Sequence, residues 1–124
     1  MKAVLLVDDE LGLVETLADF LQDAGYRVET AGSGRDGLAA MASTRPDLVM
    51  TDLMMPLMNG KEMITAMRLD PNLATVPVIL TSAGRRQMVV PPGETFPEFS
   101  LFLRKPFSLE LFMEAVRTLI GPGV

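Results

Sequence analysis

The sequence predicts an α/β fold in which a doubly wound sheet of five parallel strands is covered by helices on both faces. Short apolar runs alternate with amphipathic stretches along most of the 124 residues. The runs are almost continuously hydrophobic, as in strands buried on both faces of a parallel sheet. With 48% hydrophobic residues, a chain of this length can bury one core, so we expect one domain over residues 1–124.

The first part of the chain predicts two strands that are each followed by a helix. Residues 3–7 form an apolar strand, and residues 11–24 carry leucines at helical spacing before Gly25, which is typical of a helix C-terminus. Residues 27–31 form a short second strand. A serine followed three residues later by an aspartate predicts the start of the next helix, over residues 33–43.

The middle of the chain repeats this alternation. Residues 48–51 form the third strand, and a turn rich in proline and glycine follows over residues 56–60. Apolar side chains on one helical face predict a helix over residues 61–69. The apolar run 78–80 is the fourth strand.

The last part of the chain departs from the alternation before it resumes. A crossover helix is expected between the fourth strand and the fifth, at residues 101–103, but the segment 84–100 contains three prolines and two glycines. We therefore expect an irregular or shortened fourth helix, reduced to a turn near residues 85–90. Ser108 is a suitable N-cap for the last helix, whose apolar stripe ends before Gly121.

The apolar residues of the irregular segment allow two interpretations. They are Val89, Val90, Phe96 and Phe99. They can pack the segment onto the sheet, which is the favoured interpretation, or form a docking patch for a partner.

For the strand order we expect 2-1-3-4-5, the flavodoxin-like arrangement, which is one of the common orders of a doubly wound sheet. Ligands of such folds bind beyond the carboxyl ends of the strands, where the order reverses. The strands at 3–7 and 48–51 flank that point.

Polar residues follow the apolar strands at this edge. Asp8 and Asp9 follow the first strand, Asp52 the third, Thr81 the fourth, and Lys105 lies just beyond the fifth. Three carboxylates brought close together repel one another unless a cation neutralises them. The pattern therefore predicts a site for a hard divalent ion, and Mg²⁺ fits best because it binds through one or two carboxylates while it shares a phosphate.

Composition excludes several function classes. The net charge of −5 disfavours direct binding to nucleic acid or to anionic membranes. The absence of cysteine and histidine excludes disulfides, thiolate chemistry and an intrinsic phosphohistidine. The apolar run at the N-terminus is too short for a signal peptide or a membrane span, so we expect a cytoplasmic protein.

Four segments together resemble the receiver domain of bacterial two-component response regulators, of the kind found in chemotaxis regulators. They are Val-Asp-Asp-Glu at 7–10, Asp-Leu-Met-Met-Pro-Leu-Met-Asn-Gly at 52–60, Leu-Thr-Ser-Ala at 80–83, and Phe-Leu-Arg-Lys-Pro-Phe at 102–107. The resemblance covers essentially the whole chain and fails only around residues 84–100.

The resemblance implies a role for each residue at the metal site. Asp52 would be the phosphoacceptor and also a ligand of Mg²⁺. Asp9 would bind the ion directly, Asp8 would bind it through water, and the backbone carbonyl of Met54 would complete the protein ligands.

The resemblance also implies a switch and a partner. Thr81 would bond to the phosphoryl group, Lys105 would pair with it, and Phe102 would be the aromatic side chain that changes rotamer. The donor would be a histidine kinase or a histidine phosphotransfer protein, while the output partner stays unknown. The chain would be a phosphoacceptor switch domain, with self-catalysed phosphoryl transfer and autodephosphorylation, rather than an enzyme.

Two alternatives remain at this point. One is a receiver-like binding module that does not depend on phosphorylation, which the altered segment 84–100 leaves open. The other is an Mg²⁺-dependent phosphatase with an aspartyl-phosphate intermediate, such as the haloacid dehalogenase type. The adjacent Asp8 and Asp9 and the lack of a cap disfavour the phosphatase, because such enzymes carry an Asp-x-Asp pattern on the first strand.

Overall fold

The structure is a computed structural model that describes residues 1–84, 90 and 92–124. The strands are β1 (Ala3–Val7), β2 (Arg27–Ala31), β3 (Leu48–Asp52), β4 (Val78–Ser82) and β5 (Leu101–Arg104). The helices are α1 (Leu11–Asp23), α2 (Gly34–Ser43), α3 (Gly60–Leu69) and α5 (Leu109–Ile120). Within these described residues, no helix has both the length and the apolar character needed to span a bilayer.

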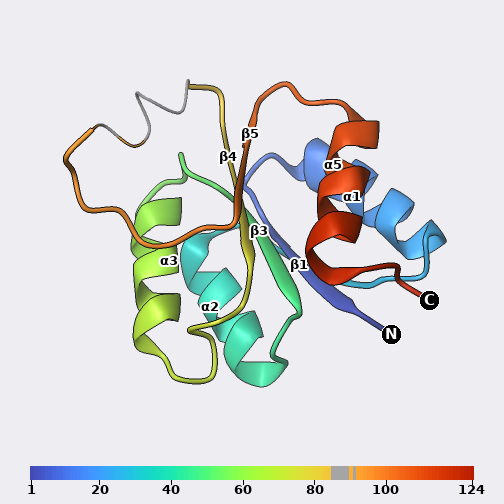
Figure 1. Cartoon of the computed structure of the whole chain (residues 1–124), viewed down its shortest axis with the longest axis horizontal. Helices are drawn as coiled ribbons and strands as arrows, with labels where there is room; N and C mark the ends of the chain where they lie inside the picture. The colour runs from blue at the N-terminus through green and yellow to red at the C-terminus, as the bar shows by residue number, and fades with distance from the viewer. Residues whose placement is uncertain (85–89, 91) are drawn as a thin grey trace.

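The five strands form one parallel sheet in the order β2-β1-β3-β4-β5, which confirms the predicted order. Helices α1 and α5 cover one face of the sheet, and α2 and α3 cover the other (Figure 1). Because β1 and β3 are neighbours while the chain proceeds outward from each of them in opposite directions, their carboxyl ends flank the point where strand order reverses.

Helix ends follow the predicted sequence signals. The Ser33 hydroxyl accepts a hydrogen bond from the amide three residues later, at 3.1 Å, and the Ser108 hydroxyl does the same at 3.0 Å. Gly25, just beyond α1, has a φ of +94°, a conformation that is open to glycine at little cost. These three predictions are confirmed.

Helix α3 begins one residue earlier than predicted, at Gly60. The cause is a capping box that the sequence interpretation missed. The Asn59 side chain accepts from the Glu62 amide at 2.8 Å, and the Glu62 carboxylate accepts from the Asn59 amide at 3.1 Å. Two amides that the first turn leaves unpaired are satisfied in this way.

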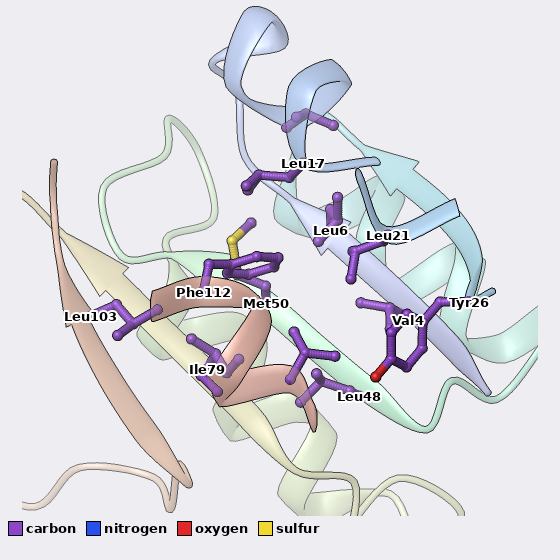
Figure 2. Close-up of a cluster of buried hydrophobic side chains, with 13 residues drawn as sticks. Val4, Leu6, Leu17, Leu21, Tyr26, Leu48, Met50, Ile79, Leu103 and Phe112 are labelled. Carbon is purple, nitrogen blue, oxygen red and sulfur yellow. The ribbon is translucent and has the colours of Figure 1, made fainter. Parts of the chain in front are cut away.

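Two apolar clusters fill the space between the sheet and its helices. On the α1/α5 face, the side chain of Phe112 is fully buried and lies beside Met50 and Ile79 in the middle of the cluster (Figure 2). On the α2/α3 face, the buried cluster is rich in methionine: Met41, Met55, Met63 and Met67. The two faces therefore differ in the kind of side chain that supports the sheet.

The segment between β4 and β5 contains no helix among its described residues, 83, 84, 90 and 92–100. This confirms the predicted irregular or shortened fourth helix, while residues 85–89 of the predicted turn lie outside the described residues. Phe96 and Phe99 pack against the cluster on the α2/α3 face, which supports the packing interpretation for these two side chains. Val89 lies outside the described residues.

Candidate functional site

The ends of β1 and β3 bring three carboxylates together. Ligand oxygens of Asp8, Asp9 and Asp52 all lie within 4.8 Å of one another. Asp8 and Asp52 are buried and Asp9 is exposed. The strands that carry them are neighbours in the sheet, so topology alone places side chains that are far apart in sequence at one edge.

Lys105 supplies the positive charge next to these carboxylates. Its Nζ lies 2.8 Å from Oδ2 of Asp8 and 3.3 Å from Oδ2 of Asp52. The side chains of Lys105, Asp8 and Asp52 are 16%, 0% and 10% exposed, so water screens both pairs weakly. The second oxygen of Asp8, Oδ1, accepts from the Glu10 amide at 2.9 Å. Asp8 is thus the more firmly held partner of the ammonium group.

Thr81 and Phe102 lie on the neighbouring strands β4 and β5, but Thr81 lies opposite Asp52 whereas Phe102 packs against an apolar cluster. Thr81 is the register partner of Asp52 and is buried, and its hydroxyl lies 3.4 Å from the Thr51 carbonyl oxygen. This long contact is a weak hydrogen bond. Phe102 is partly buried and packs against the cluster on the α2/α3 face.

The loop after β3 folds back over the end of the strand. The Met54 amide donates to the Asp52 carboxylate, and the Leu53 amide donates to the Thr81 carbonyl at 2.8 Å. The Met54 side chain is 70% exposed. The backbone of Gly60 closes this loop, because its amide donates to the Leu53 carbonyl at 2.9 Å.

Burial governs the ionisation of Asp52. Desolvation raises the pKa of its carboxyl, and Lys105 offsets this only in part, while the neighbouring Asp8 charge raises the pKa further. The net pKa lies above 3.8, the ordinary value of an aspartate carboxyl. The folded protein therefore holds this proton more tightly than the unfolded chain does, and the stability that this provides in acid is lost as pH rises through the folded pKa.

We therefore expect Asp52→Asn to raise the free energy of unfolding at pH 7 without metal, because the amide removes a buried charge while Lys105 keeps Asp8. The gain should shrink towards pH 4, where the wild-type carboxyl takes up its proton. Urea denaturation in chelator at both pH values measures it. Asp23→Asn, at the exposed end of α1, is the matched control. An Asp52→Asn protein less stable than wild type at pH 7 would contradict the sign.

The donor set fits a hard divalent cation. Three carboxylates and one ammonium group leave a net charge of about −2, which one divalent ion neutralises. Carboxylate oxygens at one edge, one of them exposed, match the ligands of Mg²⁺, which keeps several waters. The residues present therefore fit the ion that the sequence predicted.

A family model described as "response regulator receiver domain" matches residues 4–117. The chain belongs to the response regulator receiver family. Receiver domains of two-component systems are phosphoacceptor switch domains: they are phosphorylated on an aspartate, bind Mg²⁺ through acidic residues, and interact with histidine kinases or phosphotransfer proteins.

Solved structures support the same assignment of the fold. The chemotaxis response regulator CheY4 of Vibrio cholerae superposes with a TM-score of 0.87 at 31% identity, over 96% of this chain and 98% of that one. The signal receiver domain of a histidine kinase from Syntrophus aciditrophicus gives 0.86 at 30% identity, over 97% and 90%. In both comparisons, the superposition covers nearly the full length of this chain and of the matched one.

Among curated proteins, the receiver domain is similar to the DNA-binding dual master transcriptional regulator RpaA of Synechocystis sp.. The two are 32% identical over 121 residues, which is 97% of this chain and 49% of RpaA. The chain thus spans about half the length of that relative.

Proposed function

We propose that Asp52 is the phosphoacceptor of one receiver domain spanning residues 1–124, and that the phosphoryl group comes from a histidine kinase or a histidine phosphotransfer protein. The observation that carries this assignment is the contact of one ammonium group, that of Lys105, with both Asp8 and Asp52. The same proposal places the domain in the cytoplasm, in keeping with a chain that lacks cysteine.

The proposed transfer needs positioning and charge neutralisation more than unusual chemistry. An oxygen of Asp52 attacks phosphorus in line, the bond from phosphorus to the donor nitrogen breaks, and the imidazole leaves with its electron pair. Lys105, already 3.3 Å from Asp52, can pair with the new phosphoryl oxygens. Thr81, the register partner of Asp52, can turn its weakly bonded hydroxyl towards them.

Bound Mg²⁺ would neutralise charge on the phosphoryl oxygens during transfer. We propose Asp8, Asp9, Asp52 and the Met54 carbonyl as its protein ligands, with Asp8 acting through water. Asp8 suits that indirect role because both of its oxygens already accept hydrogen bonds, one from Lys105 and one from the Glu10 amide.

The test is phosphorylation by acetyl phosphate, followed by intact-mass spectrometry. Wild type with Mg²⁺ should gain one phosphoryl group, while Asp52→Asn, or wild type in excess chelator, should gain none. Asp23→Asn should label like wild type, because this side chain lies at the exposed end of α1. Equal labelling of Asp52→Asn would refute the assignment, and failure of wild type to label would favour the phosphorylation-independent binding module.

We further propose that autodephosphorylation is slow. The two positions that flank the phosphoryl group, Met54 and Ala83, are exposed but carry no polar group that could orient an attacking water. Arg85 and Arg86, which are close in sequence, lie outside the described residues.

The expected effect of Met54→Asn is a phosphoryl half-life at least about tenfold shorter than that of wild type, since an amide can align the attacking water. Phosphate release after removal of the donor measures it. Leu57→Asn is the control: its side chain is fully exposed at the tip of the same loop, and asparagine tolerates the φ of 67° found there. A wild-type half-life of only seconds at neutral pH would contradict slow hydrolysis.

A further inference from the structure

The described residues that lead into β5 run beside α3 and form no helix (Figure 1). We call residues 94–100 the strap. The strap begins at the third residue of the described range 92–124 and ends where β5 starts. Without helical hydrogen bonds, its position must come from contacts with other elements.

Arg68, in the last turn of α3, makes a polar contact with the strap. Its Nε donates to the Glu98 carbonyl at 2.9 Å. Its Nη1 donates to the carbonyls of Leu73, Ala74 and Val76, at 3.4, 3.1 and 2.8 Å. One guanidinium therefore joins the end of α3, the loop before β4, and the strap, a geometry that suits its fixed fork of donors.

Aromatic contacts hold the strap at a second point. The rings of Phe96 and Phe99 meet edge to face, with centroids 5.5 Å apart, and Nζ of Lys61 lies 5.7 Å from the Phe96 centroid. Lys61 is in the first turn of α3, whereas Arg68 is in its last turn. The strap is thus attached near both ends of the same helix.

The strap also joins the strand that carries Phe102. The Ser100 amide donates to the Val78 carbonyl at 2.8 Å, and the Ser100 hydroxyl accepts from the Val78 amide at 3.2 Å. Phe102 follows two residues later and packs against the same apolar cluster as Phe96 and Phe99. A change in the position of Phe102 must therefore alter the packing beneath the strap, because cores of this density do not deform without moving their neighbours.

We propose that the strap, latched by Arg68, carries the phosphorylation signal from Phe102 to the exposed surface of α3, in place of a fourth helix. The inference rests on the proposed function, in which phosphorylation of Asp52 would move Phe102, the side chain that the family resemblance implies as the switch. Its distinctive claim is that α3 and the strap respond together, and that Arg68 sets the resting position of the strap.

Hydrogen exchange followed by mass spectrometry tests the latch, with beryllofluoride and Mg²⁺ as the phosphoryl mimic. In wild type, beryllofluoride should raise amide exchange about tenfold in residues 94–100 and in 60–76, which are α3 and the loop after it, while α1 changes little. In Arg68→Ala, the strap amides should exchange as fast without beryllofluoride as they do in wild type with it. Arg68→Lys, which keeps the charge but not the fork, should do the same if the alanine variant folds poorly.

Arg45→Ala is the matched control. Arg45 also binds the loop before β4, through the Asn72 carbonyl at 2.8 Å and the Thr75 hydroxyl at 3.5 Å, but it does not touch the strap. In Arg45→Ala, the amides of the strap should exchange at the wild-type rate. The proposal would be overturned if beryllofluoride left the exchange of the strap amides in wild type unchanged. It would also be overturned if, without beryllofluoride, the strap amides of both Arg68 variants exchanged at the wild-type rate.

Acetyl phosphate labelling of the same samples separates this inference from the proposed function. If Asp52 is labelled but the exchange of the strap does not respond to beryllofluoride, only the latch is refuted. Wild type that takes up no phosphoryl group refutes both.

Discussion

Lys105→Ala is expected to lower the free energy of unfolding by about 3 kcal/mol at pH 7 without divalent metal. The reason is that Asp8 and Asp52, at 0% and 10% side-chain exposure, would lose the ammonium group between them and keep two buried charges. Burial lowers the pKa of Lys105, but its hydrogen bonds and charge interactions with both aspartates outweigh this, so the net pKa is raised. Its stabilising contribution is therefore complete at pH 7 and declines only in strong alkali.

Mg²⁺ should restore part of the lost stability, because the ion neutralises the same carboxylates. At a metal concentration a hundredfold above its dissociation constant, the gain would be about 2.7 kcal/mol. Urea denaturation with chelator and with Mg²⁺ measures both effects. Lys2→Ala, at an exposed position, should change stability by no more than about 0.5 kcal/mol in either condition. A Lys105→Ala protein as stable as wild type in chelator would show that the ammonium group does not hold the site.

Gly60→Ala is expected to cost about 2 kcal/mol and to slow phosphorylation of Asp52 by acetyl phosphate. A Cβ at this position would lie 2.5 Å from the carbonyl oxygen of Asp52 and 3.0 Å from Cα of Leu53. Both are backbone atoms, so the end of β3 or the start of α3 must shift. A shift of the end of β3 moves the Asp52 carboxylate, the proposed acceptor, relative to Thr81 and Lys105.

Gly12→Ala gives the matched control for this substitution. A Cβ on Gly12, in the first turn of α1, meets nothing within 4 Å, so alanine should be neutral or stabilising by up to about 1 kcal/mol. Thermal unfolding and the initial rate of acetyl phosphate labelling compare the two variants. Wild-type stability and labelling in Gly60→Ala would show that the close approach to Asp52 is not needed.

The fold and the assembly of the site were predictable from sequence because both depend on simple periodic signals. Apolar runs located β1, β3, β4 and β5, and parallel topology then placed Asp8, Asp52, Thr81 and Lys105 at one edge. The sequence could not predict that Nζ of Lys105 lies closer to Asp8 than to Asp52. A difference of a few tenths of an ångström between these two distances depends on side-chain packing. Gly60 was noticed only as a turn residue, since its closeness to Asp52 exists only after α3 docks.

The attachment of the strap was hidden for a different reason. The acceptors of Arg68 are main-chain carbonyls, which every residue possesses, so no residue type marks them in the sequence. The prolines of the segment predicted the lack of a regular helix, which holds for its described residues, but they indicate only what the backbone cannot do. The path that the backbone takes instead depends on its contacts with α3.

The methionine-rich cluster on the α2/α3 face gives the two sides of the sheet different mechanical compliance. Methionine has three freely rotating side-chain bonds and a polarizable sulfur, so it can refill space around a displaced neighbour at small cost. Branched aliphatic side chains are common to both faces, but the opposite face has Phe112 at its centre and Met50 as its one buried methionine. Phe102 packs on the soft side. We therefore expect a displacement that begins there to rearrange the methionine-rich cluster, including the packing beneath the strap, more readily than the cluster around Phe112.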